Sequence, residues 1–263
     1  MNTADQLDHR AAVAAEAARF ADLVRGADMT APVPTCPGWD LTDLTRHAGS
    51  VHRWFSVLLR QRIQAPPTSR DVDLRLPERA DGYADWLAEG AAEAAEVFAG
   101  TDLDAPMWVW GADGHARFWV RRMAFETLVH RVDAERALGL PSAVDRALAR
   151  DGVDEFLVNL PYAAIFAPKV ARLRGADRTI RFECTDTDGS WPVRLRPDGF
   201  GVLADGAADR NPADAAVPAD AVVRAPAADL LLLLYGRLDR SAATVETGGD
   251  AELLDLWFAN SEF

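Results

Sequence analysis

The chain has 263 residues, and two domains are expected because a domain usually has roughly 100 to 200 residues. Its composition, 49% hydrophobic and 26% charged, is that of a globular protein, and no apolar run approaches the roughly 18 residues of a membrane span. A net charge of −13 argues against nucleic acid or an anionic membrane surface as partner, because both require a basic patch. The expected ligand is therefore a small molecule.

The N-terminus reads MNTADQLDHR, without the basic and then apolar segments of a signal peptide, so we expect a cytoplasmic protein. We expect it to be a monomer or a homodimer. Cys36 and Cys184 are then expected to be free thiols. Lys169 is the one lysine among 28 basic residues, and alanine is abundant, which is typical of a high-GC bacterial genome.

Four helices are predicted in the first half of the chain. Thr3 and Gln6 form a weak capping box for the first helix, and Asp40 is the expected N-cap of the second. Apolar periodicity places the four helices at 5–26, 41–62, 82–98 and 117–138. Pro-rich and Gly-rich breakers separate them, and connections of this kind favour an antiparallel bundle.

The composition changes after about Arg174. Period-two alternation between Gly, Asp and Pro predicts strands at 178–186, 190–198, 199–206 and 221–226, which indicates a short antiparallel sheet. Two helices, 227–238 and 250–261, are expected to pack on it. The sequence thus predicts an α+β protein: a helical bundle over 1–142, a helical connection over 143–175 and a small α/β domain over 176–263.

Two polar residues stand on the inward face of the fourth predicted helix. Glu126 and His130 are four residues apart, so their side chains meet on one face, among Trp119 and Met123. Taken alone, such a pair is more often a hydrogen-bonded structural pair than a metal site. His47 changes this balance, because it lies on the apolar stripe of the second helix and points toward the same core.

Three ionisable groups that converge on one core require a common partner, since burying even one unpaired polar group costs on the order of 1 to 3 kcal/mol. Two imidazoles and one carboxylate suit zinc with an open fourth position, and the same set can hold iron(II) or another divalent metal. Among the other histidines, His9 is expected to face solvent and His52 to point away from His47, whereas His115 ends a loop that could overhang the site.

Familiar motifs of other enzyme classes are absent. The sequence contains no GxGxxG after a strand, no P-loop, no HExxH, no GxSxG and no CxxC. Nucleotide-binding, zincin, serine-hydrolase and thioredoxin-type activities therefore have no support. Cys36 precedes PGW at a helix entrance, where a reactive thiol is conceivable and a small structural residue is the more common case.

Two segments together resemble a known family. VPTCPGWDLTDLTRHAGSVHRW, followed some eighty residues later by RRMAFETLVHRVDAE, is similar to the mycothiol-dependent maleylpyruvate isomerase family within the DinB-like metal-binding four-helix bundles. The resemblance is strong over about 32–140 and weaker after 174, where it rests on the overall layout and on LLLLLYGR.

The resemblance implies zinc bound by His47, Glu126 and His130, with mycothiol as the thiol cosubstrate. It also implies a C-terminal domain similar to sterol-carrier folds, from which Arg237 holds ligand in a catalytic and cofactor-binding role. The implied mechanism is activation of a thiol by the metal, followed by attack of the thiolate on a small electrophile.

Further residues are candidates for supporting roles. Asp133 is expected to orient an imidazole, and Arg122 to pair with the Glu126 carboxylate. Trp39, Trp108 and Trp110 are candidates for the wall of the entrance, with Trp110 also a candidate cofactor contact. We class His115 and Asp133 with Arg237 as candidate catalytic residues.

The leading hypothesis is a zinc-dependent, mycothiol-using enzyme that catalyses either cis–trans isomerisation of a maleylpyruvate-type acid or thiol transfer. One alternative is a non-catalytic metal-binding or thiol-binding module that acts as a sensor. A second is a metal-dependent hydrolase of thiol conjugates, for which Glu126 or Asp133 would have to serve as general base.

Overall fold

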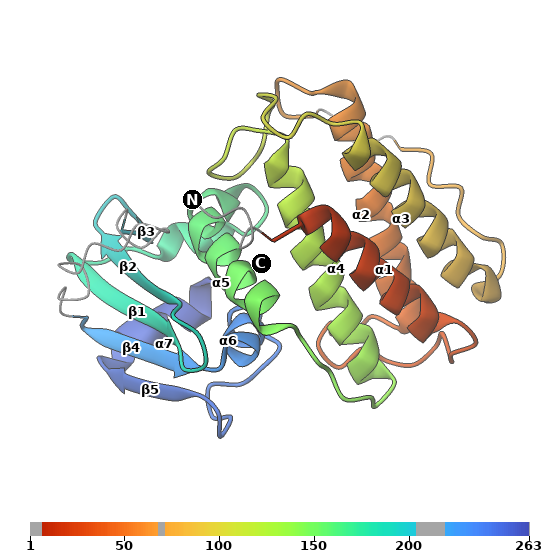
Figure 1. Ribbon diagram of the computed structural model, residues 1–263. Coiled ribbons are helices and arrows are strands. Elements are labelled where there is room, and N and C mark those ends of the chain that lie inside the picture. The colour runs from red at the N-terminus through yellow and green to blue at the C-terminus, as the bar shows by residue number, and fades with distance from the viewer. Residues whose placement is uncertain (1–6, 68–71, 204–218, 263) are drawn as a thin grey trace. The chain divides into compact units, whose positions relative to one another are not determined.

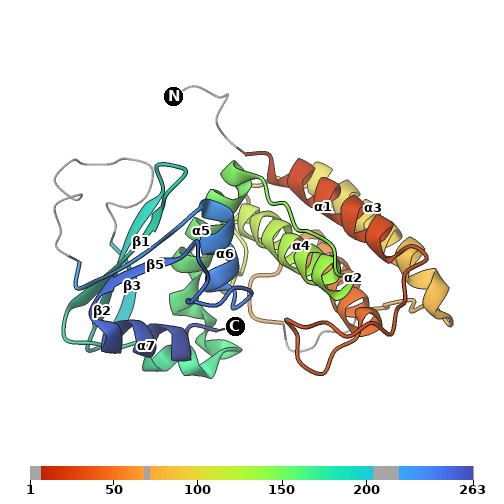
Figure 2. The ribbon, with the colours of Figure 1, turned by 90° about the horizontal axis from the view of Figure 1, so that it is seen from below.

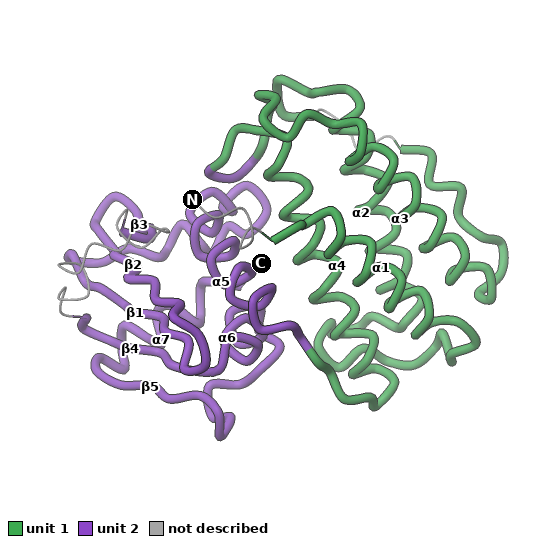
Figure 3. Tube along the Cα trace, viewed as in Figure 1, with its two compact units in different colours: residues 1–109, 113–143 green, residues 110–112, 144–263 purple. Residues whose placement is uncertain are grey.

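The computed structural model describes residues 7–67, 72–203 and 219–262, and the chain divides into two compact units. The first unit comprises 1–109 and 113–143, and the second comprises 110–112 and 144–263 (Figure 3). The predicted connection at 143–175 thus groups almost entirely with the second unit. No helix among the described residues has the length and apolar character needed to cross a membrane.

The first unit is a bundle of four helices. They are α1 (His9–Val24), α2 (Leu41–Gln61), α3 (Tyr83–Ala99), preceded by the short 3₁₀ helix η1 (Ala80–Gly82), and α4 (Arg117–Ala137). The α2, α3 and α4 boundaries lie within about one residue of the predicted ones. Asp40 caps α2 in a capping box with Asp43, and Asp8 caps α1. The predicted capping pair Thr3 and Gln6 lies outside the described residues.

The helices do not follow the simple antiparallel pattern that the connections favour. Helices α1 and α3 are antiparallel, and so are α2 and α4, because the start of one contacts the end of the other: Arg10 with Thr101 and Arg25 with Asp85, and His47 with His130 and Phe55 with Trp119. Helices α2 and α3 are parallel, and so are α1 and α4, because their contacts advance in the same direction: Gly49 with Trp86 and Arg53 with Gly90, and His9 with Phe125 and Glu16 with Arg131. The reason is the chain between α2 and α3, whose described part runs back along the bundle before α3 begins (Figure 1).

Helix α4 is buried on almost every side. Its apolar residues pack in the bundle core, and the flank that carries Arg131 and Glu135 is covered by α1. There the buried Arg131 guanidinium donates to Glu16 and Glu135, in both cases at 2.7 Å. His9 packs at the edge of the Phe125 ring with 6.2 Å between centroids, so it is half-buried and not a solvent-facing residue. A helix enclosed in this way holds its polar side chains in fixed positions.

The second unit is a sheet with helices. Its strands are β1 (Arg178–Cys184), β2 (Ser190–Arg196), β3 (Gly199–Val202), β4 (Ala221–Ala225) and β5 (Glu246–Gly249). Its helices are α5 (Arg146–Asn159), the 3₁₀ helices η2 (Leu160–Ile165) and η3 (Pro168–Arg172), α6 (Ala227–Leu234) and α7 (Ala251–Asn260). The α+β class is therefore confirmed.

The five-stranded sheet has the order β3-β2-β1-β4-β5 and is mixed, because β1 and β4 run parallel and the other pairs antiparallel. The prediction of a purely antiparallel sheet is therefore wrong for the pair β1 and β4. Alternation assigns side chains to the two faces of a strand, but it does not give the direction of the neighbouring strand. The fifth strand went unpredicted because it reads ETGG and all four of its residues are exposed.

One face of the sheet carries the apolar side chains. Phe182 lies directly between Trp191 and Val223 in the strand register, and all three are buried. On this face Trp257 of α7 packs against Phe182, and the Trp191 indole donates to Asp154 of α5 at 2.9 Å. Helices α5 and α6 lie side by side over the sheet (Figure 2). The second unit therefore has a core of its own.

Candidate metal centre

Two antiparallel helices bring three donor side chains together in the bundle. His47 comes from α2, and Glu126 and His130 come from one face of α4. His47 Nε2 lies 3.2 Å and His130 Nε2 lies 3.4 Å from Glu126 Oε1, and the three donor atoms are all within 4.8 Å of one another. The exposed side-chain fraction is 36% for His47, 22% for Glu126 and 11% for His130, so the cluster opens on the His47 side.

These distances suit a shared metal ion. Donors bound tetrahedrally at zinc–ligand distances of 2.0–2.1 Å are about 3.3 Å apart, close to the two distances from Glu126 Oε1. Two imidazoles and a carboxylate are also a donor set that zinc accepts, with a fourth position free toward the open side. The residues present therefore fit a divalent metal, and they fit it within one unit of the chain.

Asp133 determines which nitrogen of His130 faces the cluster. Its Oδ2 lies 3.0 Å from His130 Nδ1, and the carboxylate is fully buried one turn further along α4. A carboxylate accepts a hydrogen bond, so Nδ1 carries a proton, and Nε2, which faces Glu126 and His47, is the nitrogen that a metal would bind in place of the proton shared with Glu126. Metal-binding histidines are oriented in this way by an acceptor on the other nitrogen. The predicted orienting contact is thus present in the fold.

The loop before α2 holds Asp133 in turn. Thr35 donates its hydroxyl to Asp133 Oδ1 at 2.6 Å, and the Cys36 thiol lies 3.6 Å from Oδ2. Cys36, His130 and Asp133 thus form a second group of potential metal donors. In that group the Asp133 carboxylate is fully enclosed and already accepts two short hydrogen bonds, which makes a hydrogen-bond network the simpler reading.

Arg122 fixes the other oxygen of Glu126. Its guanidinium donates to Glu126 Oε2 at 2.8 Å across one helical turn, and its side chain is 3% exposed. Burial acts to raise the pKa of Glu126, but hydrogen bonds to His130 and His47 and the charge of Arg122 outweigh it and hold the pKa well below its usual range. Burial likewise acts to lower the pKa of His130, but its bonds to Asp133 and Glu126 raise it overall. Glu126 is therefore ionised, and the site favours positive charge beside it.

His52 lies on the same helix as His47 but serves a different contact. Its Nε2 lies 2.8 Å from the Thr127 hydroxyl, which itself donates to the Met123 carbonyl at 2.7 Å. The hydroxyl must then accept from His52, so Nε2 carries the proton, and within the described residues the buried Nδ1 has no hydrogen-bond partner. Burial first, and then the charge of Arg53, lower the pKa of His52 to about 4. As expected, His52 does not join the donor cluster.

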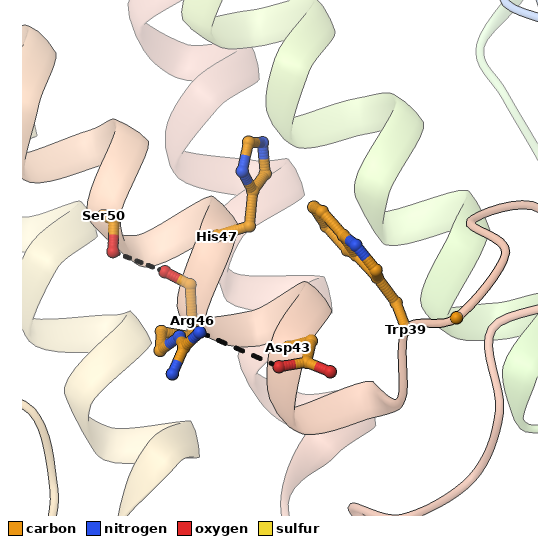
Figure 4. Close-up of a pocket in the computed structure, with 6 residues that line it drawn as sticks. Trp39, Asp43, Arg46, His47 and Ser50 are labelled. Carbon is orange, nitrogen blue, oxygen red and sulfur yellow. Dashed lines mark hydrogen bonds and ion pairs between the residues drawn. The ribbon is translucent and has the colours of Figure 1, made fainter.

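A pocket of about 460 Å³ opens beside His47. Figure 4 shows the Trp39 indole and the His47 imidazole standing side by side, with Asp43 and Arg46 from the same stretch of α2 below them. The two rings are 5.2 Å apart between centroids. Gly38 and Ser50 complete the lining. Trp39 is thus the predicted entrance tryptophan that the fold brings next to the cluster.

The other predicted site residues lie away from it or in the second unit. His115 pairs with Asp113 at 2.6 Å just before α4, and the rise of 1.5 Å per residue places the start of that helix roughly 13 Å from Glu126. Trp108 accepts the indole N–H of the buried Trp119 at its carbonyl.

Two further candidates, Trp110 and Arg237, belong to the second unit. Trp110 packs at the edge of Phe166, with 5.0 Å between ring centroids. Arg237 follows α6 and donates to the Tyr235 carbonyl at 2.7 Å. Their predicted roles stay predictions.

Sequence reasoning missed three residues of this region. Thr35 holds Asp133, and Asp43 and Arg46 line the pocket. Asp43 could have been found, because it lies four residues before His47 on one helix face, and Arg46 through Asp43, which it follows by three residues. Thr35 lies in a loop, where no periodicity indicates the direction of a side chain. Cys36 and Cys184 form no disulfide, as predicted.

Comparisons with known proteins agree with this architecture. The family model for the mycothiol maleylpyruvate isomerase N-terminal domain matches residues 10–135, and the model for the C-terminal domain of that family matches 147–256. Among solved structures, a mycothiol-dependent maleylpyruvate isomerase aligns with a TM-score of 0.61 at 12% identity, over 95% of this chain and 98% of that one. A histidine-to-alanine variant of such an isomerase gives the same values. A comparison with curated proteins finds no match.

The fold is thus that of a four-helix bundle with a His–Glu–His cluster, followed by an α/β unit with a mixed sheet. The two family models together cover most of the chain. The chain therefore belongs to the mycothiol maleylpyruvate isomerase family of enzymes.

Proposed function

We propose that this protein is a zinc-dependent enzyme that uses mycothiol to isomerise a small cis-unsaturated acid of the maleylpyruvate type. The observation that carries the proposal is the convergence of His47, Glu126 and His130, with donor distances of 3.2 and 3.4 Å and one nitrogen of His130 already held by Asp133. Family membership supports the use of mycothiol. Zinc bound there would supply a positive charge that lowers the pKa of a thiol, whose thiolate is the nucleophile.

The residues of the chain have separate tasks in this proposal. Asp133 keeps Nε2 of His130 directed into the cluster, and Arg122 keeps the Glu126 carboxylate ionised and in place. The exposed side of His47 leaves access from the pocket. Addition of the thiolate to the double bond moves its electron pair onto the conjugated carbonyl as an enolate and leaves a single bond that rotates, and return of the electron pair expels the thiolate and yields the trans acid. The thiol is regenerated, so catalytic amounts suffice.

The test combines metal analysis with activity. Protein purified without added metal should contain about one zinc per chain, and His47→Ala or His130→Ala should lose it. Zinc-loaded protein should convert maleylpyruvate only when mycothiol is present. Consumption of mycothiol in step with a trapping electrophile such as monochlorobimane would instead identify a transferase. Full metal content in both variants would contradict the assignment of the ligands.

A further inference from the structure

The pocket beside His47 has features that the thiol chemistry itself does not require. Its lining consists of one indole, that of Trp39, and of polar groups from α2, chiefly Asp43 and Arg46. His47 belongs both to this pocket and to the donor cluster. A ligand whose sulfur reaches the cluster from the His47 side therefore has this lining within reach of its remaining atoms.

The charges of the pocket favour a neutral ligand. Arg46 Nη2 lies 3.9 Å from Asp43 Oδ1, which is too long for a hydrogen bond, and both side chains are about half exposed. Their opposite charges cancel, so an anion attracted by Arg46 would also be repelled by Asp43. Together the two offer donors and acceptors at adjacent positions, a combination suited to a group with several hydroxyls.

Trp39 adds a flat apolar surface to these polar groups. Its indole packs against the His47 ring, and this contact holds the indole next to a donor of the cluster (Figure 4). An indole face packs well on the C–H groups of a six-membered sugar or cyclitol ring, whose hydroxyls then point toward polar neighbours. The pocket volume of about 460 Å³ lies within the roughly 300 to 1,000 Å³ of small-molecule sites.

We propose that this pocket is the subsite for the glucosaminyl-inositol part of mycothiol, with Trp39 as the stacking surface and Arg46 and Asp43 as hydroxyl partners. The inference rests on the proposed function, because mycothiol is the thiol named there. It assigns thiol selectivity to α2 and the loop before it, and it separates recognition of the pseudodisaccharide from binding of the sulfur.

The experiment measures binding to zinc-loaded protein by titration calorimetry with three ligands: mycothiol, N-acetylcysteine and thiol-free glucosaminyl-inositol. The wild-type protein should bind glucosaminyl-inositol and should prefer mycothiol over N-acetylcysteine by at least about tenfold, the gain expected from one well-packed ring and its hydrogen bonds. Trp39→Leu and Arg46→Ala should each reduce that preference several-fold. Arg60→Ala removes the same charge from an exposed position near the end of α2 and should leave the preference unaltered.

The outcomes separate this proposal from the proposed function. An unaltered preference in both Trp39→Leu and Arg46→Ala, or no binding of glucosaminyl-inositol by the wild-type protein, would overturn the subsite even if maleylpyruvate is isomerised. Binding of glucosaminyl-inositol that is lost in both variants would support the subsite even if mycothiol promotes no reaction. Zinc content is measured in every variant. Arg46→Gln replaces Arg46→Ala, and Trp39→Met replaces Trp39→Leu, if either fails to fold.

Discussion

At the residue scale, His130 is held at both nitrogens, and the loop before α2 takes part. Nδ1 is tied to Asp133, whose second oxygen accepts the Thr35 hydroxyl at 2.6 Å. We expect Asp133→Asn to weaken zinc binding roughly 10-fold to 100-fold, the usual cost of losing a partner behind a metal ligand. Thr35→Val keeps the shape, removes a hydroxyl one contact further from the metal, and should weaken zinc binding by a smaller factor. Competition with a zinc chelator measures this. Thr35→Ser should restore the affinity, and equal affinities for the Ser and Val variants would contradict the role of the hydroxyl.

A second residue-scale prediction concerns the buried neutral His52. Its pKa is about 4 in the folded chain against an ordinary value of 6.5, so between these pH values the unfolded chain binds more protons. The free energy of unfolding must then fall as pH falls through this window, by about 2 kcal/mol between pH 7 and 5. The charged groups that act on His52 are Arg53, Glu126, His130 and His47, with burial dominant.

Substitution of His52 isolates this contribution. His52→Gln keeps an N–H donor for Thr127 and removes the titrating ring. Urea unfolding of metal-free protein at pH 7 and pH 5 should therefore show a smaller loss of stability in the variant than in the wild type. If the free energy of unfolding fell equally in the variant and in the wild type between pH 7 and pH 5, the lowered pKa of His52 would be contradicted.

At the element scale, the site depends on how closely α2 approaches α3. A methyl group on Gly49 would overlap the Trp86 indole, and Gly49 lies two residues after His47. Alanine would ordinarily stabilise a helix interior by about 1 kcal/mol relative to glycine. Here we expect Gly49→Ala to lower the free energy of unfolding by roughly 1 to 3 kcal/mol, because the rigid ring or α2 itself must move. Gly100→Ala, at the end of α3 with ordinary contacts, is the matched control. Equal stability of the two variants in urea would contradict the close packing.

The elements also show what a sequence can predict. Apolar periodicity and caps placed α2, α3 and α4 closely, and helical spacing put Glu126 and His130 on one face, because these are local properties of a helix. The parallel pairing of α2 with α3 and of β1 with β4 was not predictable, since it depends on the course of long connections. Thr35 was missed for the same reason: its contact with Asp133 spans 98 positions and depends on tertiary packing alone.

At the scale of the whole molecule, the candidate metal site lies entirely in one of two compact units. His47, Glu126 and His130 all belong to the first unit, as do Asp133 and Arg122. A metal that binds only the folded bundle stabilises that unit by about 2.7 kcal/mol at a free concentration 100 times its Kd. The second unit has its own buried core around Phe182, and none of its described residues belongs to the donor cluster, so we expect it to gain no stability directly from the metal.

Calorimetry can separate the two units by this linkage. Zinc added to chelator-treated protein should raise the unfolding temperature of one transition by roughly 10 °C and leave a second transition in place, because only the bundle binds the metal. In His47→Ala the shift should vanish while both transitions persist, since that imidazole is an exposed donor on α2 and not part of the buried core. A single transition that moves as a whole with zinc would show that the units unfold together, and a full shift retained in His47→Ala would remove His47 from the donor set.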